Sequence, residues 1–131
     1  MEKDRRRAVL FREQELNTAD SNIEVKCMRE ELDRLVEKFN LIERTFDGFW
    51  YAFDSYLKKY PEESKEVGFF SRDSVSVELS GYSFCVTNEL DFDCIKVYMD
   101  IFLKGETVRC GDYWCIYSLD GDEFDDYFVI D

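Results

Sequence analysis

The chain has 131 residues and not one histidine. Without an imidazole, Ser-His-Asp and Cys-His catalysis are excluded, and so are metal sites that use histidine ligands. The side chain that most often serves as a general base is therefore missing. Carboxylate chemistry remains open, but no catalytic motif stands out in the sequence.

Signals of secretion, membrane insertion and disulfide bonding are scarce as well. The basic start of the chain is followed by too few apolar residues for a signal peptide, and no run approaches the ~18 apolar residues of a membrane span. The five cysteines are odd in number and form no Cys-x-x-Cys pair. We therefore expect a cytoplasmic protein whose cysteines are reduced and mostly buried.

Positive charge is in short supply, above all in the second half of the chain. The formal net charge is −13 and the sequence pI is about 4.4. Residues 1–66 carry a net charge of −3, whereas residues 67–131 carry −10. Such a protein is repelled by nucleic acid and anionic membranes and attracted to basic surfaces. Because 45% of the residues are apolar and 17% aromatic, we still expect a folded core and a single domain over residues 1–131.

The half of the chain that spans about residues 1–66 is predicted to be helical. A short basic helix is expected over residues 4–16, and apolar residues recur at every third or fourth position over residues 22–60. The only proline, Pro61, ends that pattern. An unbroken helix over residues 22–60 would be ~58 Å long, well beyond the ~15 Å radius of gyration of a domain this size. We therefore favour a break at Asp47-Gly48.

The half that spans about residues 67–131 is predicted to be an antiparallel sheet. Residues 74–79 and 82–88 are expected to be two strands joined at Ser80-Gly81, and residues 94–104 alternate between apolar and polar side chains. Residues 112–119 and 125–130 flank a hairpin turn centred on Asp120-Gly121. The predicted fold class is α+β, with N-terminal helices packed on one face of a C-terminal antiparallel sheet of four to five strands, in two layers.

Six of the last twelve residues are acidic and none is basic. Charge on an exposed strand prevents pairing with other chains, but one or two charges suffice for that purpose. The alternative is an anionic surface that docks against lysine and arginine side chains of a partner. The predicted partner-binding residues are Asp120, Asp122, Glu123, Asp125 and Asp126, with Trp114 and Tyr127 as aromatic anchors. Asp131 completes the acidic block.

Two further segments are candidate contact sites. Aromatic residues cover nearly every side of the predicted helix around residues 46–60, and Trp50, Tyr51 and Tyr56 form a possible secondary interface. The basic stretch over residues 2–7, with Arg12, is expected to pair with the chain's own acids or to stay solvated. Direct binding of nucleic acid is not expected, because the sheet half is so strongly acidic.

Catalytic and metal sites receive little support. Counted from Asp120 as an EF-hand loop, position six is Asp125 and position twelve is Asp131, whereas that loop needs glycine and glutamate there. A pair of hydrolytic carboxylates has no specificity in a chain with 30 acidic residues. We therefore expect a protein that is not an enzyme and that needs no metal or cofactor.

The leading hypothesis is a small inhibitor that occupies the basic site of a larger nucleic-acid-handling protein, such as a nuclease, and blocks it. In general character the chain resembles phage-encoded anti-defence proteins, including anti-CRISPR proteins. It resembles bacterial immunity proteins or antitoxins that neutralise nuclease toxins equally well, and no motif assigns it to a family. A structural or assembly module that dimerises through residues 22–60 is the remaining alternative.

Overall fold

The computed structural model describes residues 19–86 and 90–131, with side chains from residue 28 onward. The basic helix expected over residues 4–16 lies outside these ranges. The chain divides into two units, residues 1–34 and 35–131, and the boundary falls within helix α2 (Ala19–Lys38). The expectation of a single domain stays a prediction. No described helix is both long and apolar enough to cross a membrane.

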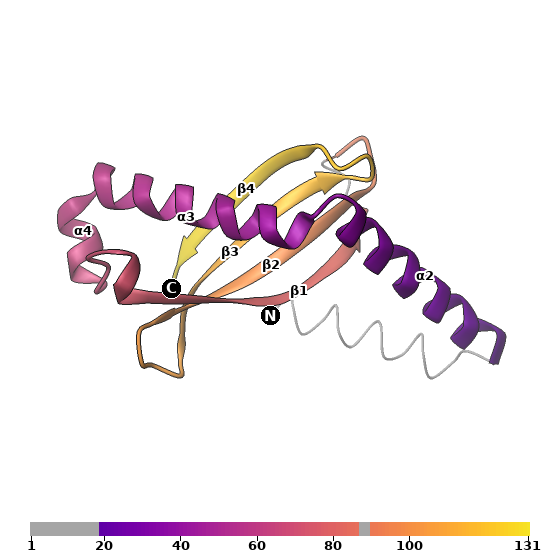
Figure 1. Cartoon of the computed structure of the whole chain (residues 1–131), viewed down its shortest axis with the longest axis horizontal. Helices are drawn as coiled ribbons and strands as arrows, with labels where there is room; N and C mark the ends of the chain where they lie inside the picture. The colour runs from indigo at the N-terminus through magenta and orange to yellow at the C-terminus, as the bar shows by residue number, and fades with distance from the viewer. Residues whose placement is uncertain (1–18, 87–89) are drawn as a thin grey trace. The chain divides into compact units, whose positions relative to one another are not determined.

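The second unit combines helices with one antiparallel sheet (Figure 1). After the end of α2 come α3 (Leu41–Lys59), α4 (Pro61–Glu66) and the 3-10 helix η1 (Arg72–Ser74). The strands that follow are β1 (Val75–Cys85), β2 (Cys94–Leu103), β3 (Arg109–Ser118) and β4 (Glu123–Ile130). They pair in the order β1-β2-β3-β4, so β1 and β4 are the edges. The predicted α+β class, with helices preceding an antiparallel sheet, is confirmed.

The break in the helical half is not at Asp47-Gly48, as predicted, but at Asn40. Asn40 adopts a left-handed conformation with φ 54° and ψ 43°, which asparagine tolerates better than most residues. Gly48 lies inside α3, where a Cβ atom would sit 2.7 Å from the Tyr113 hydroxyl oxygen. The glycine therefore serves a close approach between α3 and β3 rather than a turn. The predicted stop before Pro61 is confirmed, since α3 ends at Lys59.

The predicted turn at Ser80-Gly81 is also wrong. β1 is one strand of 11 residues, and its register with β2 shifts between Leu79 and Gly81. The glycine marks a bulge, which bends a strand without reversing it. The sheet therefore has four strands, within the predicted four to five.

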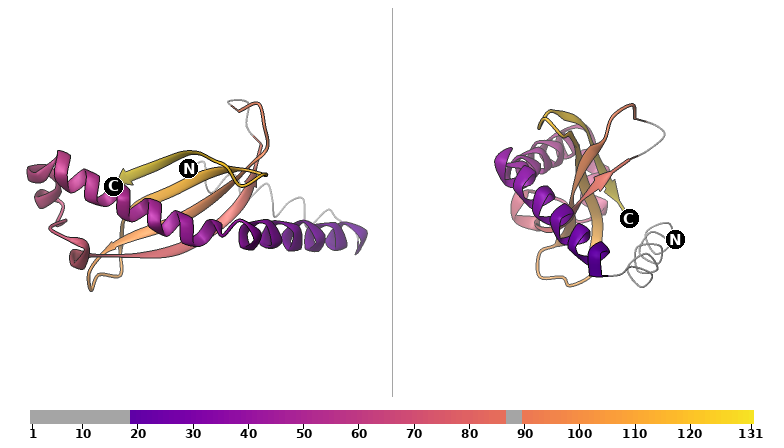
Figure 2. Two further views of the ribbon diagram at one scale, coloured as in Figure 1. Left: turned by 45° about the horizontal axis from the view of Figure 1, so that its top comes forward. Right: turned by 90° about the vertical axis from the view of Figure 1, so that its right-hand side faces the viewer.

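One face of the sheet is covered by α3, which runs along it (Figure 2). In β2 the buried residues alternate with half-exposed ones, as predicted from the sequence. The buried residues on the covered face are Ile95, Val97, Met99 and Ile101. Lys96, Tyr98, Asp100 and Phe102 are half-exposed, and they lie on what we call the open face.

Aromatic side chains hold α3 on the covered face. The Phe49 ring lies 5.7 Å from Tyr113 of β3 and 6.0 Å from Phe128 of β4, centroid to centroid. Phe53 lies 5.3 Å from Phe69, and Phe49, Phe53 and Phe69 are all buried. Each buried phenylalanine contributes about 1.5–3 kcal/mol to folding, so this cluster fixes which face of the sheet is covered.

The close approach at Gly48 generates a stability prediction. Gly48→Ala should destabilise the protein by about 1–3 kcal/mol through overpacking against the Tyr113 hydroxyl, although alanine favours helices by about 1 kcal/mol over glycine. In a Tyr113→Phe background the same change should be neutral or stabilising, because the blocking oxygen is gone. Urea unfolding of the four proteins measures both changes, and equal effects of Gly48→Ala in the two backgrounds would contradict the proposed contact.

Candidate functional site

The β3–β4 hairpin is built around Ser118, and the turn predicted at Asp120-Gly121 is confirmed. The Ser118 hydroxyl accepts hydrogen bonds from the backbone N–H groups of Asp120 (3.3 Å) and Asp122 (3.2 Å). The backbone N–H of Gly121 donates to the Ser118 carbonyl at 3.0 Å. Gly121 has φ 87°, a conformation that glycine adopts without strain.

The turn is fastened to the start of α3. The Arg44 guanidinium donates to the carbonyl oxygen of Gly121 at 2.8 Å and to that of Phe39 at 3.3 Å. It also lies over the Tyr117 ring, 4.9 Å from the centroid. The Phe39 ring packs so closely on Gly121 that a Cβ atom there would be 2.5 Å away. The acidic turn is therefore held in place by the helix layer.

The predicted binding acids of the hairpin are exposed, and among the described residues they have no cationic partner. All five predicted binding acids, from Asp120 to Asp126, are exposed. Within the part of the chain that the structure describes, none of them forms an ion pair. Asp131 differs, because its carboxylate lies 3.3 Å from the guanidinium of Arg109, which also pairs with Asp112. Most of the negative charge at this hairpin is therefore left unneutralised by the described cations.

The strand alternation divides these acids between the two faces. Asp126 lies opposite Cys115 on the covered face, and Asp125 lies opposite Ile116 on the open face. The buried Tyr113 hydroxyl donates a hydrogen bond of 2.6 Å to Asp126. Burial, and then this hydrogen bond, raise the pKa of Tyr113, so the hydroxyl stays protonated. Asp126 thus has a structural role that the sequence did not reveal.

The predicted aromatic anchors are brought together on the open face. Trp114 of β3 and Tyr127 of β4 are directly opposite each other. Their rings stack, with centroids 5.1 Å apart and an interplanar angle of 20°. Tyr98 of β2 lies opposite Trp114 on its other side, and its hydroxyl is 2.8 Å from the Ser83 hydroxyl. We call Tyr98, Trp114 and Tyr127 the aromatic row.

A row of acids that sequence reasoning missed runs beside the aromatic row. Glu78, Asp100 and Asp112 lie directly opposite one another on β1, β2 and β3. Like charges in such positions repel. Arg109 is bonded to Asp112, and that hydrogen bond is the largest cause of its raised pKa. The alternation of residues 94–104 places Asp100 on the polar side, but only the strand register brings the three acids together.

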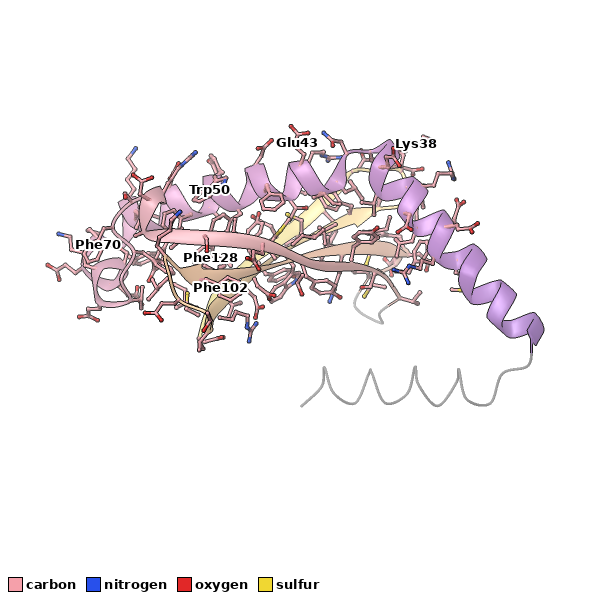
Figure 3. All side chains as sticks on the ribbon, turned by 60° about the horizontal axis from the view of Figure 1, so that its bottom comes forward. Lys38, Glu43, Trp50, Phe70, Phe102 and Phe128 are labelled. Atoms are coloured by element: carbon pink, nitrogen blue, oxygen red, sulfur yellow. The ribbon has the colours of Figure 1, made fainter. Side chains whose placement is uncertain are left out.

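The three residues of the predicted secondary interface differ in exposure, and their role in binding stays a prediction. Trp50 is half-buried on α3 (Figure 3), with its ring 4.8 Å from Phe49, and Tyr56 is half-buried 5.5 Å from Phe128. Burial raises the pKa of Tyr56, as do the nearby acids of α4 to a lesser extent. Only Tyr51, which is 80% exposed, projects into solvent. Trp50 and Tyr56 therefore contribute to packing at the margin of the core.

The four cysteines in the described ranges are free thiols. Cys94 is buried opposite Cys85, and burial is the main reason that its pKa is raised to about 11. Among the described residues, no group of three or more Cys, Asp or Glu side chains is placed to hold a metal ion.

No family model, curated protein or solved structure matches the chain.

The division of the hairpin acids predicts different effects on stability. Asp126→Ala should cost about 1–3 kcal/mol, because it leaves the buried Tyr113 hydroxyl without its acceptor. Asp125→Ala, the matched control on the open face, should change stability by about 0.5 kcal/mol or less. Urea unfolding measures both values. Similar losses of stability in the two variants would show that the hydrogen bond from Tyr113 to Asp126 does not stabilise the fold.

Proposed function

We propose that this protein is a non-enzymatic inhibitor that binds the basic site of a larger nucleic-acid-handling protein, such as a nuclease, and excludes its nucleic acid. The proposal is supported by one observation above all. The exposed acids Asp120, Asp122, Glu123 and Asp125 lack ion-pair partners among the described residues, and they lie on a hairpin whose turn is held in place by α3. An anionic surface of this kind is complementary to the cations that contact phosphates.

The placement of these charges favours fast association. Exposed charge of one sign raises the rate of encounter with an oppositely charged partner. Because Arg44 and Phe39 fix the turn, little conformational freedom is lost when a partner binds. The aromatic row beside the acids supplies apolar contact area, which slows dissociation once the partner is seated.

The alternatives are supported to different extents. An immunity protein or antitoxin that neutralises a nuclease toxin would use the same acidic surface, so it differs only in the identity of the partner. A module that dimerises through residues 22–60 has less support, because α3 already uses its apolar face within the chain. The buried residues of that face are Leu41, Thr45, Phe49 and Phe53.

Neutralising the turn tests the proposal. The triple variant Asp122→Asn, Glu123→Gln, Asp125→Asn leaves Asp126, and therefore the bond to Tyr113, intact. Proteins retained from the native cell by the wild-type chain at about 50 mM salt would be purified, and their affinities for both chains measured. We expect the triple variant to bind about tenfold or more weakly, and duplex DNA or RNA to compete with the wild type.

A matched control separates local docking from net charge. The variant Glu62→Gln, Glu63→Gln, Glu66→Gln removes the same charge from the exposed side chains of α4, which lies at the other end of the sheet from the hairpin (Figure 1). It should bind as the wild type does. The proposal fails if the two triple variants bind equally well, or if nucleic acid does not compete.

A further inference from the structure

The chain itself contains an arginine seated on an indole and held by a carboxylate. The Arg72 guanidinium lies over the Trp50 ring, 5.2 Å from the centroid. Arg72 donates from Nε to Oδ1 of Asp54 at 3.2 Å and from Nη2 to Oδ2 at 2.6 Å. This hydrogen bond is the largest cause of the lowered pKa of Asp54. A planar cation that stacks on an aromatic face and donates to a carboxylate is an arrangement that arginine makes and lysine does not.

The open face offers the same groups around a second indole, Trp114. One face of that indole stacks on Tyr127. Among the described residues, no lysine or arginine lies over the indole. Asp112 and Ile116 flank it on β3, each two residues away and therefore ~6.6 Å along the strand. Asp125 is the residue opposite Ile116, so a carboxylate borders the indole on each side.

The two flanking carboxylates are not equivalent. Asp112 already binds Arg109. Asp125 forms no ion pair with any described residue, and only its Oδ1 accepts a described hydrogen bond, of 2.8 Å from the backbone N–H of Asp126. Its second oxygen is therefore available to a donor from another molecule. Trp114 and Asp125 therefore offer an indole and a carboxylate oxygen, the two kinds of group that hold Arg72.

We propose that the open face binds an arginine side chain of the partner, which stacks on Trp114 and donates to Asp125. The inference rests on the proposed function, because it names the side chain that the inhibitor recognises. Glu78 and Asp100 add negative charge beside the site, so the surface is complementary to a segment with several arginines. The surface should discriminate against lysine, whose compact ammonium cannot stack and donate to a carboxylate in the same planar manner.

Two peptides test the proposal without the natural partner. A short glycine-spaced arginine peptide and a lysine peptide of equal length and charge would be titrated into the full chain at about 50 mM salt, with the two tryptophan indole N–H signals followed by NMR. The arginine peptide should bind about fivefold more tightly or better. It should shift the Trp114 signal and leave the Trp50 signal, already covered by Arg72, unchanged.

Substitutions at Trp114 and Asp125 test whether the preference for the arginine peptide comes from this site. Trp114→Leu and Asp125→Asn should each bring the two peptides to similar affinity, whereas Trp114→Tyr, which keeps an aromatic face, should retain part of the preference. Equal affinity of the wild type for both peptides would overturn the inference whether or not any variant folds. A preference that survives Trp114→Leu, or a shift confined to the Trp50 signal, would overturn it as well.

The peptide titration and the partner-binding experiments together distinguish the inference from the proposed function. If the wild type prefers the arginine peptide but nucleic acid does not compete with it for the cellular partner, the arginine site stands and the inhibitor mechanism fails. If the triple variant loses its partner while the wild type shows no preference, the inhibitor mechanism stands and the arginine site fails.

Discussion

The contact between α3 and β3 is the constraint on which the rest of the second unit depends. Gly48 allows the helix to approach until only the Tyr113 hydroxyl separates the two elements. Thr45 bonds its own helix through Leu41 and reaches Tyr117 at 2.9 Å. Buried hydroxyl groups must find partners, so these contacts fix the position of α3 along the strand as well as its distance from the sheet.

That contact also decides which acids are available to a partner. Because the odd-numbered residues of β3 face the helix, the register with β4 turns Asp126 inward toward Tyr113 and turns Asp125 outward. The acidic sequence at the end of the chain is therefore two groups of residues with different roles. One carboxylate completes the interface between helix and sheet, and the others remain on the turn and the open face.

The sequence predicted the elements better than it predicted their junctions. The alternation of residues 94–104 identified the strand and its buried side, and Asp120-Gly121 marked a true turn. The predictions of a helix break at Gly48 and a turn at Gly81 were wrong. Glycine also occurs at close contacts and bulges, and the sequence alone does not distinguish these uses. Asn40, which lies in the break between α2 and α3, carried a weaker signal than either glycine.

The sequence did not predict that Trp114 and Tyr127 pair with each other, because this depends on the register of the hairpin. Both were proposed as anchors because they were aromatic and close to the acids, and alternation alone left open whether they were buried. The register places them opposite each other on the open face. The acid row was missed for a related reason, since Glu78, Asp100 and Asp112 are far apart in sequence and neighbours only across strands.

The row of acids formed by Glu78, Asp100 and Asp112 helps to distinguish two explanations of the negative charge on the sheet. Charge on β4 has a structural explanation, since an edge strand needs protection from pairing with other chains. Asp100 and Asp112 lie on the inner strands β2 and β3, where there is no edge to protect and where facing carboxylates repel. A single described cation, Arg109, is bonded to this row. A repulsion retained at the centre of a sheet, beside an aromatic row, is consistent with the proposed function, in which this surface binds another molecule's cations.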